Sequence, residues 1–120
     1  MPKKSGSERP ADWPKNGFYY HFKHTRDGPI NEGAYEVVGV GRMTESKDEN
    51  PELMVIYRQL YEHPTPIPGR PFELRPLKMF TGTIRRAGYS GPRFVRITNQ
   101  NVIDRLIWVR KQMYPEAAPL

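Results

Sequence analysis

The chain has 120 residues, a formal net charge of +6, a hydrophobic fraction of 37%, 13 prolines and 10 glycines. This length allows one domain but no second substantial core, and the absence of cysteine excludes disulfides, thiolate metal sites and a cysteine nucleophile. Because no apolar run is long enough to cross a bilayer and the polar start does not resemble a secretory signal, we expect a protein of the reducing cytoplasm.

The positive charge is concentrated in the second half of the chain. Residues 1–60 carry nine Lys/Arg and nine Asp/Glu, whereas residues 61–120 carry ten Lys/Arg, eight of them Arg, and four Asp/Glu. A local basic surface concentrates anions, and a high isoelectric point is one feature of nucleic-acid-binding proteins. The charge alone therefore leaves both a small anion and a nucleic acid open as partners.

The folded part is predicted to begin at Gly17, after a polar, disordered tail over residues 1–16. Short runs rich in Val, Ile, Tyr and Phe, bounded by turn-forming residues, are typical of β-strands. Three such runs predict strands over 18–24, 34–43 and 53–61. The third run is apolar on both faces, which is typical of a strand with a neighbour on each side.

The second half is predicted to contain a hairpin. A proline-dense loop over 62–71 comes first, and Pro76 then favours a single helical turn over 75–80. A glycine-containing turn follows, and it separates two further β-forming runs. The hairpin strands are predicted over 81–87 and 92–98.

A helix is predicted over residues 99–114, with Asn99 or Thr98 as its cap. Apolar residues at helical spacing predict its buried face: Val102, Leu106, Val109 and Met113. Residues 115–120 are predicted to be a tail. Short strands followed by one helix favour a mainly β fold: a small, partly open β-barrel over 17–98 with the C-terminal α-helix packed on it.

Six short motifs, in their order and spacing, resemble a family known as domain of unknown function 1653. The first, 17–23 (GFYYHFK), resembles its opening G-x-Y-x-H-[YF]-K. The others are 35–40 (YEVVGV), 42–46 (RMTES), 55–61 (VIYRQLY), 75–80 (RPLKMF) and 93–94 (RF). Met43 stands where the family often has His. The resemblance covers roughly residues 17–97 and implies an SH3-like barrel, but it implies no reaction.

The first predicted strand carries the leading hypothesis for function. Alternation along the strand places three polar-tipped side chains on one face: Tyr19, His21 and Lys23. A ring, an imidazole and an amine in one row can hold an anionic or planar ligand, and the family's Y-x-H-x-K falls on the same positions. Other polar residues in family motifs are candidates to converge on this row: Glu45, Tyr57 and Arg75. We predict a non-catalytic module that binds a small anionic or nucleotide-like ligand, without a metal or a cofactor.

Three alternatives stay open. The same polar residues could fix loops through hydrogen bonds and ion pairs instead of binding a ligand. A nucleic-acid-associated module would use the basic hairpin, which carries Arg85, Arg86, Arg93 and Arg96. Because Arg93 and Arg96 are expected on opposite faces, the four cations do not line one groove. A protein-interaction module of the SH3-like kind is the third alternative.

Catalytic motifs are not found in the sequence. It has no G-x-S-x-G elbow, no phosphate-binding G-x-x-x-x-G-K-[ST] loop and no paired carboxylates. His21 and His24 form an H-x-x-H pair, but residues i and i+3 of a strand face opposite sides, so we expect no chelation.

Overall fold

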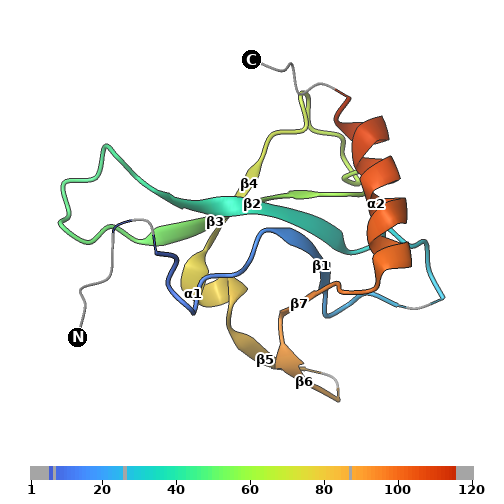
Figure 1. Ribbon diagram of the computed structural model, residues 1–120, viewed down its shortest axis with the longest axis horizontal. Coiled ribbons are helices and arrows are strands. Elements are labelled where there is room, and N and C mark those ends of the chain that lie inside the picture. Colours follow the sequence, from blue (N-terminus) through green and yellow to red (C-terminus); the bar gives the residue numbers. More distant parts are fainter. Residues whose placement is uncertain (1–5, 7, 26, 87, 116–120) are drawn as a thin grey trace.

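The computed structural model describes residues 6, 8–25, 27–86 and 88–115. Its main element is a five-stranded antiparallel sheet with the strand order β4-β3-β2-β1-β7, beside a two-stranded sheet of β5 and β6 (Figure 1). The strands are β1 (Gly17–His21), β2 (Ala34–Arg42), β3 (Leu53–Gln59), β4 (Glu73–Pro76), β5 (Thr83–Arg86), β6 (Tyr89–Pro92) and β7 (Phe94–Arg96). The helices are α1 (Leu77–Phe80) and α2 (Gln100–Met113). The prediction of a mainly β, partly open fold with a C-terminal helix is confirmed.

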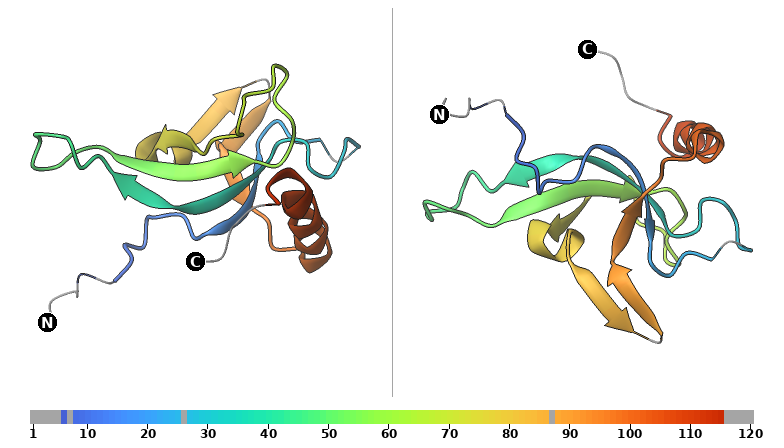
Figure 2. Two further views of the ribbon diagram at one scale, coloured as in Figure 1. Left: turned by 90° about the horizontal axis from the view of Figure 1, so that it is seen from above. Right: turned by 60° about the horizontal axis from the view of Figure 1, so that its bottom comes forward.

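The sheet separates two layers. Figure 2 shows α2 on one side of the sheet, and α1 with the β5–β6 hairpin on the other. We call the side that carries α1 and the hairpin the inner face, and the side that carries α2 the helix face. Each side has its own hydrophobic cluster, so the chain builds two small cores rather than one.

Strand β1 contributes to both cores because successive side chains of a strand point to opposite faces. Tyr19 is buried on the inner face with Tyr57, Phe80 and Phe94. Phe18 is buried on the helix face, in a cluster completed by Ala34, Leu60, Ile97 and Leu106. The alternation predicted from the sequence is therefore correct at the start of this strand.

Helix α2 begins at the predicted cap. The side chain of Asn99 accepts hydrogen bonds from the backbone N–H groups of Asn101 and Val102. Leu106 is fully buried against the sheet, and the other apolar residues of the predicted face pack around it or lie partly buried.

Glu36, on β2, ties the helix to the sheet. Its side chain is largely buried and accepts from two arginines, Arg58 on β3 at 3.0 Å and Arg110 on α2 at 2.6 Å. Breaking such a partly buried charge network by removing the carboxylate would leave two cations without their counter-ion. The network therefore fixes the register between α2 and the central strands.

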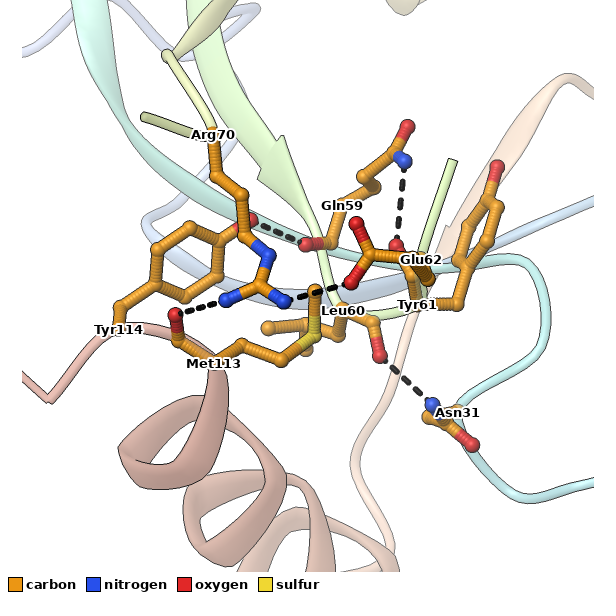
Figure 3. A network of polar contacts seen from close by, with 8 residues as sticks. All are labelled: Asn31, Gln59, Leu60, Tyr61, Glu62, Arg70, Met113 and Tyr114. Atoms are coloured by element: carbon orange, nitrogen blue, oxygen red, sulfur yellow. Dashed lines mark hydrogen bonds and ion pairs between the residues drawn. The ribbon is translucent and has the colours of Figure 1, made fainter. Parts of the chain in front are cut away.

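The end of α2 is also held by the loop that follows β3 (Figure 3). Arg70 donates to the backbone carbonyl of Met113 at 2.8 Å and to Glu62 at 2.6 Å. The hydroxyl of Tyr114 donates to the carbonyl of Gln59 at 2.6 Å. These bonds explain how a proline-dense loop packs against the helix end without a strand of its own.

Some predicted boundaries are wrong. β1 ends at His21, three residues early, because the chain turns there and the N–H of His24 donates to the carbonyl of His21. β4 was not predicted, and Pro76 lies at the N-cap of α1 rather than inside the helix. The strand that pairs with β5 is β6, which lies in the predicted turn between 87 and 92, whereas the strand predicted over 92–98 becomes β7 and pairs with β1.

Other expectations are met or lie outside the described residues. β3 lies between β2 and β4, as its apolar faces predicted. Parts of the two predicted tails, residues 1–5, 7 and 116–120, are not described. Within the described residues, α2 and α1 are both too short or too polar to span a membrane.

We expect Leu106→Ala to lower the free energy of unfolding by about 2–5 kcal/mol, because it opens a cavity between α2 and the sheet. Trp108→Ala is the matched control on the same helix. Its side chain is 63% exposed, so the change should stay within about 0.5 kcal/mol. Chemical denaturation measures both values, and equal losses would contradict the packing described here.

Candidate anion-binding site

His21 ends β1, and its ring lies against aromatic side chains of the inner face. The ring centroid is 5.2 Å from that of Phe94, edge to face, and 6.4 Å from that of Tyr35. The backbone N–H of Lys23 donates to Nδ1 of His21 at 3.2 Å. Because Nδ1 accepts this bond, the neutral ring carries its proton on Nε2 and can donate from there.

The surroundings of His21 favour the neutral ring. Burial and, to a smaller extent, the positive charges of Arg75, Lys23 and Arg93 together lower the pKa of His21 from 6.5 to about 4. A neutral imidazole at physiological pH is a hydrogen-bond donor that adds no charge to its three cationic neighbours.

Arg75 and Arg93 approach this ring from different parts of the chain. Arg75 comes from β4, and its guanidinium lies 5.4 Å from the centroid of the Phe94 ring. Arg93 lies at the break between β6 and β7, where its N–H donates to the carbonyl of Gly82 and its carbonyl accepts from Phe22. The bond from Phe22 holds Arg93 beside the end of β1, whereas Arg85 and Arg86 lie on β5, which does not pair with β1.

Arg75 and Arg93 differ from the other polar side chains of the described residues in their hydrogen bonding. Among the described residues, the side-chain nitrogen or oxygen atoms that are sealed from solvent without a hydrogen-bond partner are Nε of Arg75 and Nε of Arg93. The ion pairs among the described residues use other arginines, namely Arg58, Arg70 and Arg110. A buried donor left unpaired costs about 1–3 kcal/mol, so each of these two atoms calls for an explanation.

His21, Arg75, Arg93 and Lys23 form a group that we call the cluster. Lys23 belongs to it, but not through the strand alternation that was predicted. It lies in the turn after β1 and not on the strand, so strand alternation does not place it beside His21. Its side chain is exposed, with Nζ 5.8 Å from the centroid of the Phe22 ring. Its charge nevertheless acts on His21, as described above.

Tyr19 and Tyr57 belong to the aromatic core rather than to the surface of the cluster. Each is 6% exposed, and the Tyr19 hydroxyl donates to the carbonyl of Lys15 at 2.7 Å. Tyr57 packs against Tyr35 with a ring-centroid distance of 5.4 Å. Both residues support the floor of the cluster from below, and neither offers a face for stacking a ligand.

The structure does not bring Glu45 to the cluster. Glu45 follows the end of β2 at Arg42, whereas the β1 residue next to His21 pairs with Ala34 at the start of β2. At about 3.3 Å per residue, the length of β2 separates these two ends by roughly 25 Å. Figure 1 shows the loop after β2 at the far end of the sheet from α2.

The hairpin arginines are also dispersed. Arg85 and Arg86 are exposed on β5, near the hairpin tip. Arg96 lies on β7 opposite Tyr19, with its guanidinium beside Gly17. Arg93 alone of the four joins His21 and Arg75, so the described chain does not present one continuous groove of these cations.

The cluster is an open surface and not an enclosed pocket. The principal hollows of the described residues are lined by other side chains, between the proline-dense loop and the end of α2 or beside Tyr20 and His24. The ring of His24 stacks on Tyr20 at a centroid distance of 3.6 Å, so the two histidines of the H-x-x-H pair face different surroundings. Among the described residues, no group of three His, Asp or Glu could hold a metal ion.

Residues 17–96 match a family model described as a protein of unknown function, DUF1653. The chain belongs to this family. A crystal structure of a DUF1653 protein from Bordetella bronchiseptica is 26% identical, and the match covers 70% of this chain and 91% of that one with a TM-score of 0.48. The comparison with curated proteins finds no match.

The cluster joins positions from three separate DUF1653 motifs of this chain. His21 lies in the opening motif, Arg75 begins the R-P-x-x-M-F motif, and Arg93 begins the late R-F. Sequence reasoning placed Arg93 with the hairpin and missed Tyr35 and Phe94 as the aromatic floor. The signal that could have found them is the R-F motif at 93–94, which belongs to the same set of family motifs as those that contain His21 and Arg75.

We predict that the ring of His21 titrates with a midpoint near pH 4 and that Arg75→Met raises this pKa, because one of the charges that lower it is removed. NMR of the imidazole protons as a function of pH measures both. Arg85→Met, which removes an exposed hairpin charge, should leave the pKa unchanged.

The lowered pKa of His21 makes the stability of the fold depend on pH. The unfolded chain binds a proton at His21 below about pH 6.5, whereas the folded chain does so only near pH 4. The contribution of His21 to stability is therefore complete above pH 6.5 and is lost as the pH falls toward 4. His21→Gln should flatten this part of the stability profile, and an unchanged profile would contradict the assignment.

Proposed function

We propose that this DUF1653 protein is a non-catalytic binding module that holds a small anionic ligand, including nucleotide-like anions, on its inner face. Arg75, Arg93 and Lys23 supply positive charge, and His21 supplies a directed hydrogen bond. The His21 ring and the Arg75 guanidinium pack against Phe94, which together with Tyr35 forms the floor of the site. Because the sequence has no cysteine, we place its activity in the reducing cytoplasm.

The observation that carries this proposal is the pair of sealed, unpartnered Nε atoms on Arg75 and Arg93. An arginine kept only for structure is expected to form an ion pair, as Arg58 and Arg110 do with Glu36. Arg75 and Arg93 have no such partner among the described residues, yet both are partly buried, and Arg75 lies over the Phe94 ring. An anion supplied from outside, bound to the other N–H groups of the two guanidiniums, would compensate their unpaired charge.

A functional role for these arginines makes a specific prediction. Replacing Lys23 and Arg75 together with Met should weaken the binding of a small anion by about tenfold or more, since each removes a charge-assisted hydrogen bond. The same variant should melt within about 5 °C of the parent or above it, because one unpaired buried donor disappears. The measurements are an NMR titration with acetate, sulfate and adenosine monophosphate, and thermal denaturation.

The control is the Arg85→Met, Arg86→Met variant, which also removes two positive charges but from the exposed hairpin tip. It should bind small anions like the parent. If the Lys23 and Arg75 variant loses stability and keeps its anion binding, these side chains only fix loops and the proposed function is wrong. The proposed function is equally wrong if none of the three anions perturbs His21.

The nucleic-acid alternative has less support in the structure, because Arg93 and Arg96 lie away from Arg85 and Arg86. It remains testable by the same hairpin-tip variant. A single-stranded oligonucleotide bound by the hairpin would lose affinity in that variant and would dissociate steeply with added salt. Binding centred on His21 that tolerates salt supports the anion site instead.

A further inference from the structure

The donors of the site come from separate segments of the chain. The His21 ring and the Arg75 guanidinium lie against the aromatic floor, and the charges of Arg93 and Lys23 act on the same imidazole. A carboxylate that binds one guanidinium through both oxygens keeps its remaining lone pairs in the plane of that guanidinium. A tetrahedral oxyanion presents at least three oxygens, so it can accept from both arginines and the imidazole at once.

The charge of the site favours two negative charges on the ligand. Arg75, Arg93 and Lys23 carry three positive charges, and His21 is neutral. The carboxylates that form ion pairs among the described residues are Glu36 and Glu62, which are already bonded to Arg58, Arg70 and Arg110. A dianion would offset most of this local charge, whereas a monoanion would leave two cations uncompensated.

We infer, on the basis of the proposed function, that the ligand class is a doubly charged tetrahedral oxyanion of the phosphate monoester type, and that His21 selects it by donating from Nε2. The N–H of Lys23 occupies Nδ1 and fixes this tautomer. The Nε2 atom has no acceptor among the described residues and is not sealed from solvent, which leaves it available to a ligand.

Binding of such an anion changes the balance of charge around His21. The charged groups that face the ring are Arg75 from β4, Lys23 from the turn after β1 and Arg93 from the β6–β7 break, and Tyr35 from β2 is the neutral titratable neighbour. A bound dianion offsets the three cations and favours the imidazolium form. Ligand binding therefore brings a proton to His21 as the pH falls below neutrality.

The class of ligand is tested by titrating the full chain with sodium sulfate, methyl phosphate and sodium acetate at neutral pH and constant ionic strength, following the His21 ring by NMR. Sulfate and methyl phosphate should each bind about tenfold or more tightly than acetate, which corresponds to one additional charge-assisted hydrogen bond. Equal affinity for acetate would overturn the ligand class but leave the proposed function standing. Binding of none of these anions, together with none of adenosine monophosphate, would overturn both.

The role of His21 is tested by two substitutions. His21→Gln keeps a neutral N–H donor near the position of Nε2, whereas His21→Phe keeps the ring volume and removes the donor. We expect His21→Phe to weaken sulfate binding by about tenfold and His21→Gln by only about threefold or less. Equal effects of the two variants would show that His21 only shapes the site.

Sulfate also provides a readout that a structural role would not affect. It keeps two negative charges throughout the range in which His21 titrates, so a change in the ring pKa reports the protein and not the ligand. Saturating sulfate should raise the pKa of His21 by about one unit or more, as expected for an anion close to a cation. An unchanged pKa in the sulfate-bound protein would contradict the proposed contact.

Discussion

Strand β1 has both faces buried, and the rest of the structure depends on this constraint. Phe18 must meet the helix face, and Tyr19 must meet the inner aromatic cluster, so a one-residue slip of the strand would exchange the two cores. The pairing of β1 with β2 on one side and β7 on the other then fixes where His21 lies. The position of the proposed site is thus a consequence of the packing that holds the fold together.

The arginines on the two faces of the sheet differ in whether they have an acidic partner. On the helix face, Arg58 and Arg110 share the carboxylate of Glu36, and the network ties α2 to the sheet. On the inner face, the Arg75 guanidinium lies over the Phe94 ring, and neither Arg75 nor Arg93 has an acidic partner among the described residues. The first arrangement contributes to stability, whereas the second leaves two donors unpaired, for which the proposed ligand would account. Retaining such unpaired cations is typical of sites where stability is given up for function.

Local sequence patterns correctly predicted the elements whose formation depends on residues close together in the sequence. Alternation identified the two faces of β1, and helical spacing with Asn99 as the cap identified α2. β4 escaped prediction because its four residues have no alternation of their own and are held by pairing with β3, which is distant in sequence. Arg93 was assigned to the wrong neighbours because the break between β6 and β7 depends on bonds to Gly82 and Phe22. Glu45 shares a motif with the site residues but lies at the other end of β2.

The most direct test of the anion site is the behaviour of the arginine side chains themselves, observed through their Nε–H resonances by NMR during a titration with methyl phosphate. The resonances of Arg75 and Arg93 should move together and saturate at one ligand concentration, since the bound anion lies against both guanidinium groups. Arg85 and Arg86, which have the same chemistry at the exposed hairpin, should move little. Movement of the hairpin pair alone, or uniform small shifts of all arginines, would contradict a site built on Arg75 and Arg93.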